Sequence, residues 1–334
     1  MVSVLITGGT GFIGIPLVKR LHELGHKLKL LVRETSDITP FEGLNNIEYI
    51  IGDVQDINSL NEGADGVEYI YHLAAYTGIW AKKKPIYYDI NVQGTENVAN
   101  ISLEKNIKVF YVSSFTAIGP TPEEPVDESY EKEKFCMEYE RSKYQAKKLV
   151  KNYIQKGFKV IIFYPGIVYG PGDFNIFGRM LYDVMRGKTF PLGLCPGKGE
   201  SITCLTYIND LVDVLVNVID TEDFFGEDFI IGGDNVKFKE YLNLIAEIGG
   251  NKKAKKIPMT FAKLYAWALE VKAKFNKKIP YLTRPTLNAL KYNRAYSSKK
   301  AVEKLGYKIT PLREGLQETI AWYKNYSEKE KKKS

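Results

Sequence analysis

Short apolar segments alternate with amphipathic segments along the first half of the chain. The apolar segments are rich in Val, Ile, Leu and aromatic residues, which is typical of strands that are buried on both faces of a sheet. Segments of helical periodicity such as residues 15–25 separate them, and a parallel crossover needs a covering helix of this kind. The pattern therefore predicts an α/β fold with a doubly wound parallel sheet. Its strands would cover residues 3–7, 27–32, 47–53, 67–75, 109–114, 159–165 and 228–233.

The pattern loosens after Pro165. Two stretches rich in Gly and Pro, 169–175 and 192–201, predict loops, and 208–220 predicts a helix. The segment from 236 to 325 is mainly helical in pattern and more basic. We expect residues 1–168 together with about 204–233 to form the sheet domain, and about 169–203 together with 234–325 to form a smaller, mainly helical part. Residues 326–334 would be a disordered basic tail.

The composition is that of an ordinary globular protein, with 44% hydrophobic and 26% charged residues and a net charge of +7. Basic and acidic residues alternate along most of the chain, and no basic block accompanies a nucleic-acid-binding motif, so we expect no nucleic-acid partner. Three cysteines without a C-x-x-C motif, and the lack of a leader or a long apolar run, favour a cytoplasmic protein. His22 and His26 stand four residues apart but lack a third ligand, so we expect no metal site.

The first predicted strand runs into the stretch T-G-G-T-G-F-I-G, residues 7–14. Gly8, Gly11 and Gly14 are spaced by three, and the stretch also contains a G-x-G-x-x-G pattern. Glycine at these places lets the chain turn tightly and lets a pyrophosphate approach the backbone, while the helix N-terminus offers free N–H groups. The position between a strand and a helix distinguishes a phosphate loop from a Gly-rich turn. The sequence therefore predicts a Rossmann-type, dinucleotide-binding domain, with the helical part binding the substrate.

The end of the second predicted strand bears on the choice of cofactor. An acidic residue there would accept a hydrogen bond from a ribose 2′-OH, whereas an arginine suits a 2′-phosphate. Arg33 comes first in this chain and Glu34 second. We expect NADP, with NAD as the alternative that Glu34 keeps open.

Four pairs place a tyrosine four residues before a lysine: Tyr130/Lys134, Tyr139/Lys143, Tyr144/Lys148 and Tyr296/Lys300. Such a pair can act in proton transfer, because a nearby ammonium lowers the pKa of a phenol. The chain has 23 tyrosines, so the spacing alone does not choose among the pairs. We expect Tyr130, in a charged loop, and Tyr296, in the C-terminal part, to lie at the surface.

Seven stretches together resemble the extended short-chain dehydrogenase/reductase family, of the NAD-dependent epimerase/dehydratase type. They are T-G-G-T-G-F-I-G (7–14), G-D-V-Q-D (52–56), H-L-A-A (72–75), N-V-Q-G-T (91–95), V-S-S (112–114), Y-E-R-S-K (139–143) and Y-P-G-I-V-Y-G-P-G-D (164–173). Within that family the chain looks most like the dihydroflavonol-reductase-like branch, which also holds 3β-hydroxysteroid dehydrogenases and a hopanoid-associated sugar epimerase. The resemblance is strong over about residues 1–233 and weaker to about 325.

The resemblance assigns the catalytic Ser, Tyr and Lys of the family to Ser114, Tyr139 and Lys143. Ser114 would end a strand at the carboxyl edge of the sheet, where ligands bind in open α/β folds, and Tyr139 and Lys143 would share one face of a helix over about 136–155. Tyr139 would transfer the proton, Ser114 would bind the substrate oxygen, and Lys143 would lower the tyrosine pKa and hold the nicotinamide ribose. Asn91 would be a structural anchor. The cofactor-binding residues that the resemblance implies are Gly8, Gly11, Phe12, Ile13, Gly14, Arg33, Asp53, Val54, Ala74, Ala75, Tyr139, Lys143, Pro165 and Ile167.

Three functions remain open. The first is an NADP-dependent reductase or dehydrogenase of a bulky substrate that could be apolar. The second is an NAD-dependent nucleotide-sugar epimerase; Phe115-Thr116 replaces the Asp-Glu pair of the family's dehydratases and counts against dehydration. The third is a non-catalytic, dinucleotide-binding regulatory protein, which would commonly have lost the Tyr or the Lys. We expect a small-molecule substrate and a homodimer. Candidate walls of the substrate pocket are Tyr76, Trp80, Thr116, Tyr169 and Phe174, and each aromatic could equally be ordinary core.

Residues 259–278 have the pattern of a helix with one apolar stripe and several lysines. One interpretation docks the stripe on the substrate side and leaves the lysines in water. The other places the helix over the mouth of the active site and on an anionic membrane surface. The stripe comprises Phe261, Leu264, Tyr265, Ala268, Val271 and Phe275, and the other side carries Lys263, Lys274, Lys277 and Lys278 with Trp267.

Overall fold

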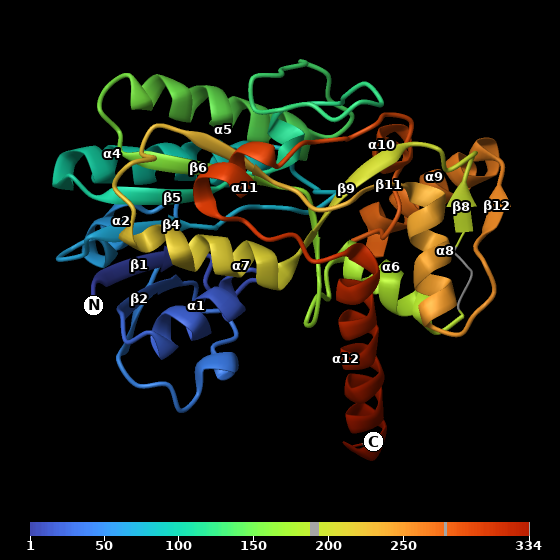
Figure 1. Cartoon of the computed structure of the whole chain (residues 1–334), viewed down its shortest axis with the longest axis horizontal. Helices are drawn as coiled ribbons and strands as arrows, with labels where there is room; N and C mark the ends of the chain where they lie inside the picture. Colours follow the sequence, from blue (N-terminus) through green and yellow to red (C-terminus); the bar gives the residue numbers. More distant parts are fainter. Residues whose placement is uncertain (188–193, 277–278, 334) are drawn as a thin grey trace.

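The computed structural model describes residues 1–187, 194–276 and 279–333 (Figure 1). Its main sheet has seven strands in the order β10-β6-β5-β4-β1-β2-β3, and every pairing in it is parallel. The apolar pattern therefore predicted all the strands of this sheet, with ends that differ by a few residues. Their bounds are β1 Ser3–Thr7, β2 Lys27–Val32, β3 Ile47–Ile51, β4 Tyr69–His72, β5 Lys108–Val112, β6 Val160–Pro165 and β10 Asp228–Ile231.

Helices cover both faces of this sheet, which is why its strands are apolar at nearly every position. Successive side chains of a strand point to opposite faces. Val4 and Ile6 accordingly pack in one core cluster, and Leu5 packs in the other. Figure 1 shows α1 and α7 on one side of the sheet and α4 and α5 on the other. The helices are α1 Gly14–Glu23, α2 Ile57–Gly63, α4 Gly94–Lys105, α5 Glu138–Ile154 and α7 Ile208–Asn217.

The strand order reverses between β1 and β4. From β1 the chain moves outward through β2 to β3, and it then returns to β4 and moves the other way through β5 and β6. The loops that follow β1 and β4 consequently diverge at the carboxyl edge of the sheet. A ligand-binding crevice in a doubly wound fold lies at such a reversal.

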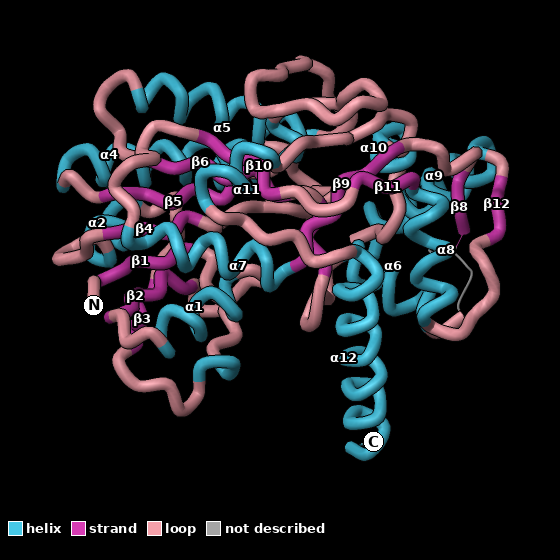
Figure 2. Tube along the Cα trace, in the orientation of Figure 1, coloured by secondary structure: helices cyan, strands magenta, loops and turns pink. Residues whose placement is uncertain are grey.

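The C-terminal part packs beside the carboxyl edge and is mainly helical (Figure 2). It contains a sheet of order β11-β9-β7 and a pair of strands, β12 and β8. The segment around Arg294 bridges to residues 121, 126 and 203 and so ties this part to the main domain. The elements are β7 Ile167–Tyr169, α6 Ile176–Met185, β8 Leu194–Pro196, β9 Ile202–Tyr207, β11 Asn235–Lys237, α8 Phe238–Ile248, β12 Lys255–Ile257, α9 Met259–Asn276, α10 Arg284–Ala289, α11 Lys299–Leu305 and α12 Leu312–Lys333.

Two features of the C-terminal part differ from the expectations. Helix α12 continues to Lys333, where a disordered tail was expected from residue 326. Helix α9 turns its predicted apolar stripe outward instead of docking it. It packs on α10 through Ala262 and Ala266, which meet Leu287 in a small core cluster, because small side chains let two helices approach closely. In the described ranges, no helix is long and apolar enough to cross a membrane.

Candidate active site

The glycine loop between β1 and α1 has a geometry that only glycine permits at two positions. Gly8 has a φ of +76°, and a Cβ there would lie 2.6 Å from the backbone nitrogen of Ala74. A Cβ on Gly14 would lie 2.3 Å from the carbonyl oxygen of Gly8. The loop therefore brings the start of α1 close to the ends of β1 and β4.

The same loop leaves hydrogen-bond donors for an anion. Among the described residues, the backbone amides of Phe12 and Ile13 have no acceptor, and the first turn of α1 carries no acidic side chain. The N-terminus of a helix with free amides is a favourable site for phosphate. The loop thus fits the pyrophosphate of a dinucleotide.

The other predicted cofactor residues follow the strands of the main sheet along its carboxyl edge. Arg33 follows β2 and is exposed, and no ion pair between described residues engages its guanidinium. Asp53 follows β3, and its carboxylate accepts from the amide of Gln55 at 3.0 Å. Val54 is buried, and the amide of Ala74 donates to Thr7 Oγ1 at 3.3 Å. Ala75 follows Ala74, Pro165 ends β6, and Ile167 begins β7.

The three predicted catalytic residues meet between β5 and α5. Ser114 is buried two residues after β5, and its side chain lies close to Tyr139 on the first turn of α5. Ser114 Oγ also accepts from the amide and the hydroxyl of Thr116, at 3.3 and 3.0 Å. Lys143 lies one turn further along α5. It is buried, with Nζ 5.4 Å from the centre of the Tyr111 ring.

Burial dominates the electrostatics of this group. It raises the pKa of Tyr139 to about 12, against the opposing effect of the nearby Ser114 hydroxyl. Burial also lowers the pKa of Lys143 to about 7. The expectation that Lys143 would lower the tyrosine pKa is therefore wrong for the chain by itself. Desolvation disfavours both charged forms, and a lysine that is partly neutral exerts little pull on the phenol.

A buried histidine that the sequence analysis did not assign links the glycine-loop strand to α4. His72 Nδ1 lies 2.8 Å from Thr7 Oγ1, and its Nε2 lies 3.0 Å from Thr95 Oγ1. Because Thr95 donates its own proton to the carbonyl of Asn91, Nε2 must be the protonated ring nitrogen. Burial and the charge of Lys143 lower the pKa of His72 to about 3, so the ring is neutral at pH 7.

Asn91 continues this connection to the catalytic helix, which agrees with its predicted role as an anchor. Its Nδ2 donates to Ser142 Oγ at 2.9 Å, and Ser142 donates to the carbonyl of Tyr139 at 2.8 Å. Asn91 also exchanges two hydrogen bonds with the backbone of Tyr76. The side chains of one buried network therefore fix both α5 and the loop after β4.

Glu140 and Arg294 form a second connection that the sequence did not reveal. The Glu140 carboxylate accepts from the amides of Cys136 and Met137, at 2.6 and 3.3 Å, and closes the start of α5. Arg294 donates to the same carboxylate. Both side chains are largely buried. The residue next to Tyr139 is thus bound to the C-terminal part.

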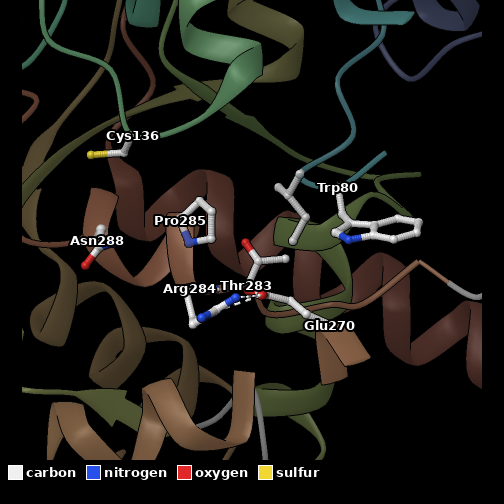
Figure 3. Close-up of a pocket in the computed structure, with 8 residues that line it drawn as sticks. Trp80, Cys136, Glu270, Thr283, Arg284, Pro285 and Asn288 are labelled. Atoms are coloured by element: carbon white, nitrogen blue, oxygen red, sulfur yellow. Dashed lines mark hydrogen bonds and ion pairs between the residues drawn. The ribbon is translucent and has the colours of Figure 1, made fainter. Parts of the chain in front are cut away.

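A cavity of about 410 Å3 lies between the loop after β4, the approach to α5, and helices α9 and α10 (Figure 3). Trp80, a candidate wall of the substrate pocket, lines this cavity. Cys136, three residues before Tyr139, also lines it. The charged lining residues are Glu270 and Arg284, which bind each other through contacts of 2.9 and 2.8 Å. The remaining lining residues are Ile79, Thr283, Pro285 and Asn288.

The other four candidates for pocket walls lie outside this lining. Tyr76 supports the wall by donating to the carbonyl of Trp80 at 3.1 Å, and Thr116 binds Ser114. Tyr169 is a core residue that packs on Tyr207, and Phe174 packs among aromatic residues of α12. Tyr169 is therefore ordinary core, the alternative that the sequence left open, whereas Phe174 is 43% exposed and belongs neither to the core nor to this lining.

The competing tyrosines have other partners. Tyr144 donates to Glu131 at 2.7 Å, and Tyr130 donates to the carbonyl of Pro120 at 3.2 Å. Tyr296 is fully buried against Phe115, with ring centres 5.2 Å apart, so its expected surface position is wrong. This contact gives Phe115 a packing role.

Comparison with known proteins gives one family and several relatives. Residues 4–232 match the family described as "NAD dependent epimerase/dehydratase family". Sterol demethylase protein B of Methylococcus capsulatus is 27% identical, over 96% of this chain and 98% of that protein.

Solved structures share the whole architecture. The crystal structure of gox2253 superposes with a TM-score of 0.81 at 30% identity, covering 98% of this chain and 99% of the other. A UDP-glucose 4-epimerase of Thermotoga maritima, solved with UDP-glucose, has a TM-score of 0.77 at 20% identity, over 97% and 99% of the two chains. The second likeness concerns the fold alone.

Proposed function

The chain belongs to the NAD dependent epimerase/dehydratase family, and we propose that it is an NADP-dependent oxidoreductase interconverting a carbonyl and an alcohol on a bulky, apolar substrate. Its relatives are enzymes of the extended short-chain dehydrogenase/reductase type. The observation that carries the proposal is the joint placement of two features. Ser114, Tyr139 and Lys143 meet at the carboxyl edge, and in the nearby cavity the one cation among the described lining residues, Arg284, is paired with the lining carboxylate of Glu270.

The proton chemistry follows from the partners of Ser114. Its oxygen already accepts two hydrogen bonds from Thr116, so its own proton is free to donate to a substrate oxygen or to Tyr139. Tyr139 is protonated at pH 7 because its pKa is raised to about 12. In the direction of reduction, Tyr139 donates that proton to the carbonyl oxygen. The bound nicotinamide cofactor supplies the hydride.

Arg33 supports NADP as the cofactor. It stands directly after β2, exposed, with its guanidinium outside the ion pairs of the described residues. A guanidinium at this position can bind a 2′-phosphate with two donors.

The cavity supports an apolar substrate. Ile79, Trp80 and Pro285 supply apolar surface, and the Arg284 guanidinium is held by Glu270. A nucleotide sugar would bring a diphosphate whose charges need partners in a partly dehydrated site. The sterol demethylase relative, as its name states, belongs to sterol chemistry, which is consistent with a bulky apolar compound.

A substrate screen tests this function directly. Aldehydes, sterol-like ketones and alcohols, and UDP-sugars would be offered with NADPH or NADP+, and cofactor absorbance would be followed. We expect cofactor consumption with one of the apolar carbonyls or alcohols. Turnover of UDP-sugars to epimers, without net change in the nicotinamide, would replace the proposal by its main alternative.

That alternative, an NAD-dependent nucleotide-sugar epimerase, is favoured by one observation. The chain shares its complete fold with a UDP-glucose 4-epimerase. An epimerase oxidises and re-reduces the same substrate, so the purified protein would retain NAD. Denaturing the protein and identifying the released nucleotide would distinguish the two functions before any substrate is known.

A further inference from the structure

Helix α9 carries its large apolar side chains on the outside. Phe261, Leu264, Trp267 and Phe275 are 69%, 63%, 49% and 83% exposed. At 100° per residue, Phe261, Leu264 and Phe275 fall within about 60° of one another, with Trp267 at the edge of the group. The buried face is formed by Ala262, Ala266 and Ala273. An ordinary surface helix has the opposite arrangement.

The positive charge of the protein is concentrated around this helix. Residues 251–295 contain 12 Lys and Arg and one Glu, whereas the rest of the chain contains 35 Lys and Arg and 39 Asp and Glu. This agrees with the more basic character that the sequence analysis gave to residues 236–325. The single carboxylate, Glu270, is neutralised by Arg284. The exposed lysines with described positions are Lys252, Lys253, Lys255, Lys256, Lys272, Lys274 and Lys291.

These charges lie close enough to interact. The ammonium of Lys291, just after α10, lowers the pKa of Lys263 on α9. Lys272 and Lys274 closely precede Phe275, the most exposed large apolar residue of this helix. Figure 1 shows α9, β8 and β12 together at the end of the molecule opposite the N-terminus. The apolar and basic groups therefore share one end of the protein. Lys277 and Lys278, predicted for the same surface, lie outside the described residues.

An anionic lipid surface can bind both the exposed apolar side chains and the lysines. A second copy of the chain would cover the aromatic residues, but a two-fold contact sets a patch against itself and would bring the two lysine clusters together. A nucleic acid would satisfy the lysines and leave Phe261, Leu264 and Phe275 without apolar partners. Acyl chains can take the apolar residues while headgroup phosphates take the lysines, and tryptophan favours the boundary between them.

We propose that α9 and its flanking basic segments bind the surface of an anionic membrane, with Phe261, Leu264 and Phe275 inserted among the acyl chains. The contact is interfacial, since α9 carries too many charged residues to cross a membrane. Glu270 of the same helix lines the cavity, so the bound chain would hold the cavity beside the lipid. This consequence suits the apolar substrate proposed above. The binding itself does not rest on that proposal, and its test uses no turnover.

Vesicle sedimentation with the full chain tests the surface. The vesicles would contain phosphatidylcholine alone or with 30% phosphatidylglycerol, at low and high salt. We expect binding to the anionic vesicles at low salt only, because screening weakens lysine–headgroup attraction. Lys272→Glu/Lys274→Glu should reduce partitioning about tenfold or more. Lys19→Glu/Lys27→Glu, the same charge change at exposed positions of the N-terminal domain, is the control and should bind nearly as the parent does.

A second variant separates insertion from simple charge attraction. Phe261→Ser/Leu264→Ser/Phe275→Ser keeps every lysine and should also lose most of the binding. With Trp80→Phe and Trp322→Phe in place, acyl-brominated lipid should quench the fluorescence of Trp267. Three results would overturn the proposal. The first is no binding to anionic vesicles at low salt, and the second is vesicle binding that the serine variant leaves unchanged. The third is a dimer that the serine variant converts to monomers, while the parent protein does not bind vesicles. Binding of a DNA or RNA duplex in place of the vesicles would overturn it as well.

Discussion

Arg294, from the C-terminal part, donates a hydrogen bond to the carboxylate of Glu140, the residue that follows Tyr139. Glu140 is also the acceptor for the amides that precede α5, so one carboxylate closes the helix and receives the arginine. The position of the proposed proton donor therefore depends on contact between the two parts of the molecule. The remaining arginine contact, to the carbonyl of Ala289, extends the connection to the end of α10.

Replacing Arg294 should damage both stability and turnover. In Arg294→Met, the buried carboxylate of Glu140 loses its charged partner, and we expect a loss of about 3–5 kcal/mol in the free energy of unfolding. Urea denaturation of the purified protein measures this value. The double variant Arg294→Met/Glu140→Gln removes the unpaired charge and should recover a large part of the loss.

The double variant also tests the positioning role of the pair. If Glu140 only stabilised the fold, recovered stability would bring recovered kcat. We expect kcat to stay low with little change in cofactor affinity, because Tyr139 is held less accurately. If the losses in the free energy of unfolding of Arg294→Met and Glu140→Gln simply added in the double variant, the two side chains would not interact.

Tyr139→Phe should abolish turnover while NADPH affinity stays within a few fold. The hydroxyl carries the proton, and the ring only packs; general acid–base catalysis contributes roughly 10² to 10⁴ in rate. Steady-state rates with the substrate found by screening, and fluorescence titration with NADPH, measure the two quantities. Tyr144→Phe, on the same helix but bonded to Glu131, is the matched control and should retain most of the rate. A Tyr139→Phe rate above about a tenth of the parent rate would exclude Tyr139 as the catalyst.

Arg33→Asp should reverse the cofactor preference. A carboxylate repels the 2′-phosphate of NADPH and can accept a hydrogen bond from the 2′-OH of NADH. Calorimetric titration with each cofactor should show a large loss for NADPH and a small loss or a gain for NADH. Equal losses for both would show that Arg33 does not discriminate, and NAD would then be the better assignment.

Local patterns predicted the parts of this protein that depend on neighbouring residues in the chain. Strands buried on both faces appear as continuous apolar runs, and Gly14 is required by its contacts with Gly8 and Gly9 within one β-α unit, whereas the contact that requires Gly8 is with Ala74 after β4. The proximity of Ser114 to Tyr139 was expected from a family resemblance, since no local rule joins residues that lie 25 apart.

Long-range contacts account for what the sequence did not reveal. The partner of Glu140 lies 154 residues away in the chain, and the partner of Glu270 lies 14 residues away. The same residue types also form ordinary surface ion pairs, so the sequence alone did not identify these contacts. Helix α9 has two apolar faces, one of Ala and one of Phe and Leu, and periodicity favours the larger side chains as the core. The neighbouring helix α10 instead takes the alanines. Desolvation likewise cannot be recognised from neighbouring residues in the sequence. The pKa of Tyr139 is therefore raised, although the sequence analysis expected it to be lowered.

Lys143 makes the stability of the cofactor-free protein depend on pH. Its pKa in the folded chain is lowered to about 7, below its value in an unfolded chain. Between these values the unfolded state binds more protons, so the free energy of unfolding should rise with pH, by about 2 kcal/mol from pH 7 to pH 9. Lys143→Met should lose this contribution and exceed the stability of the parent at pH 7, while losing activity.

The control is Lys147→Met, one turn along α5. Lys147 is equally buried but is paired with Glu131 at 3.2 Å, so its removal should destabilise the protein. Urea denaturation at pH 7, 8 and 9 compares the three proteins, and a constant difference between parent and Lys143→Met across this range would contradict the assignment.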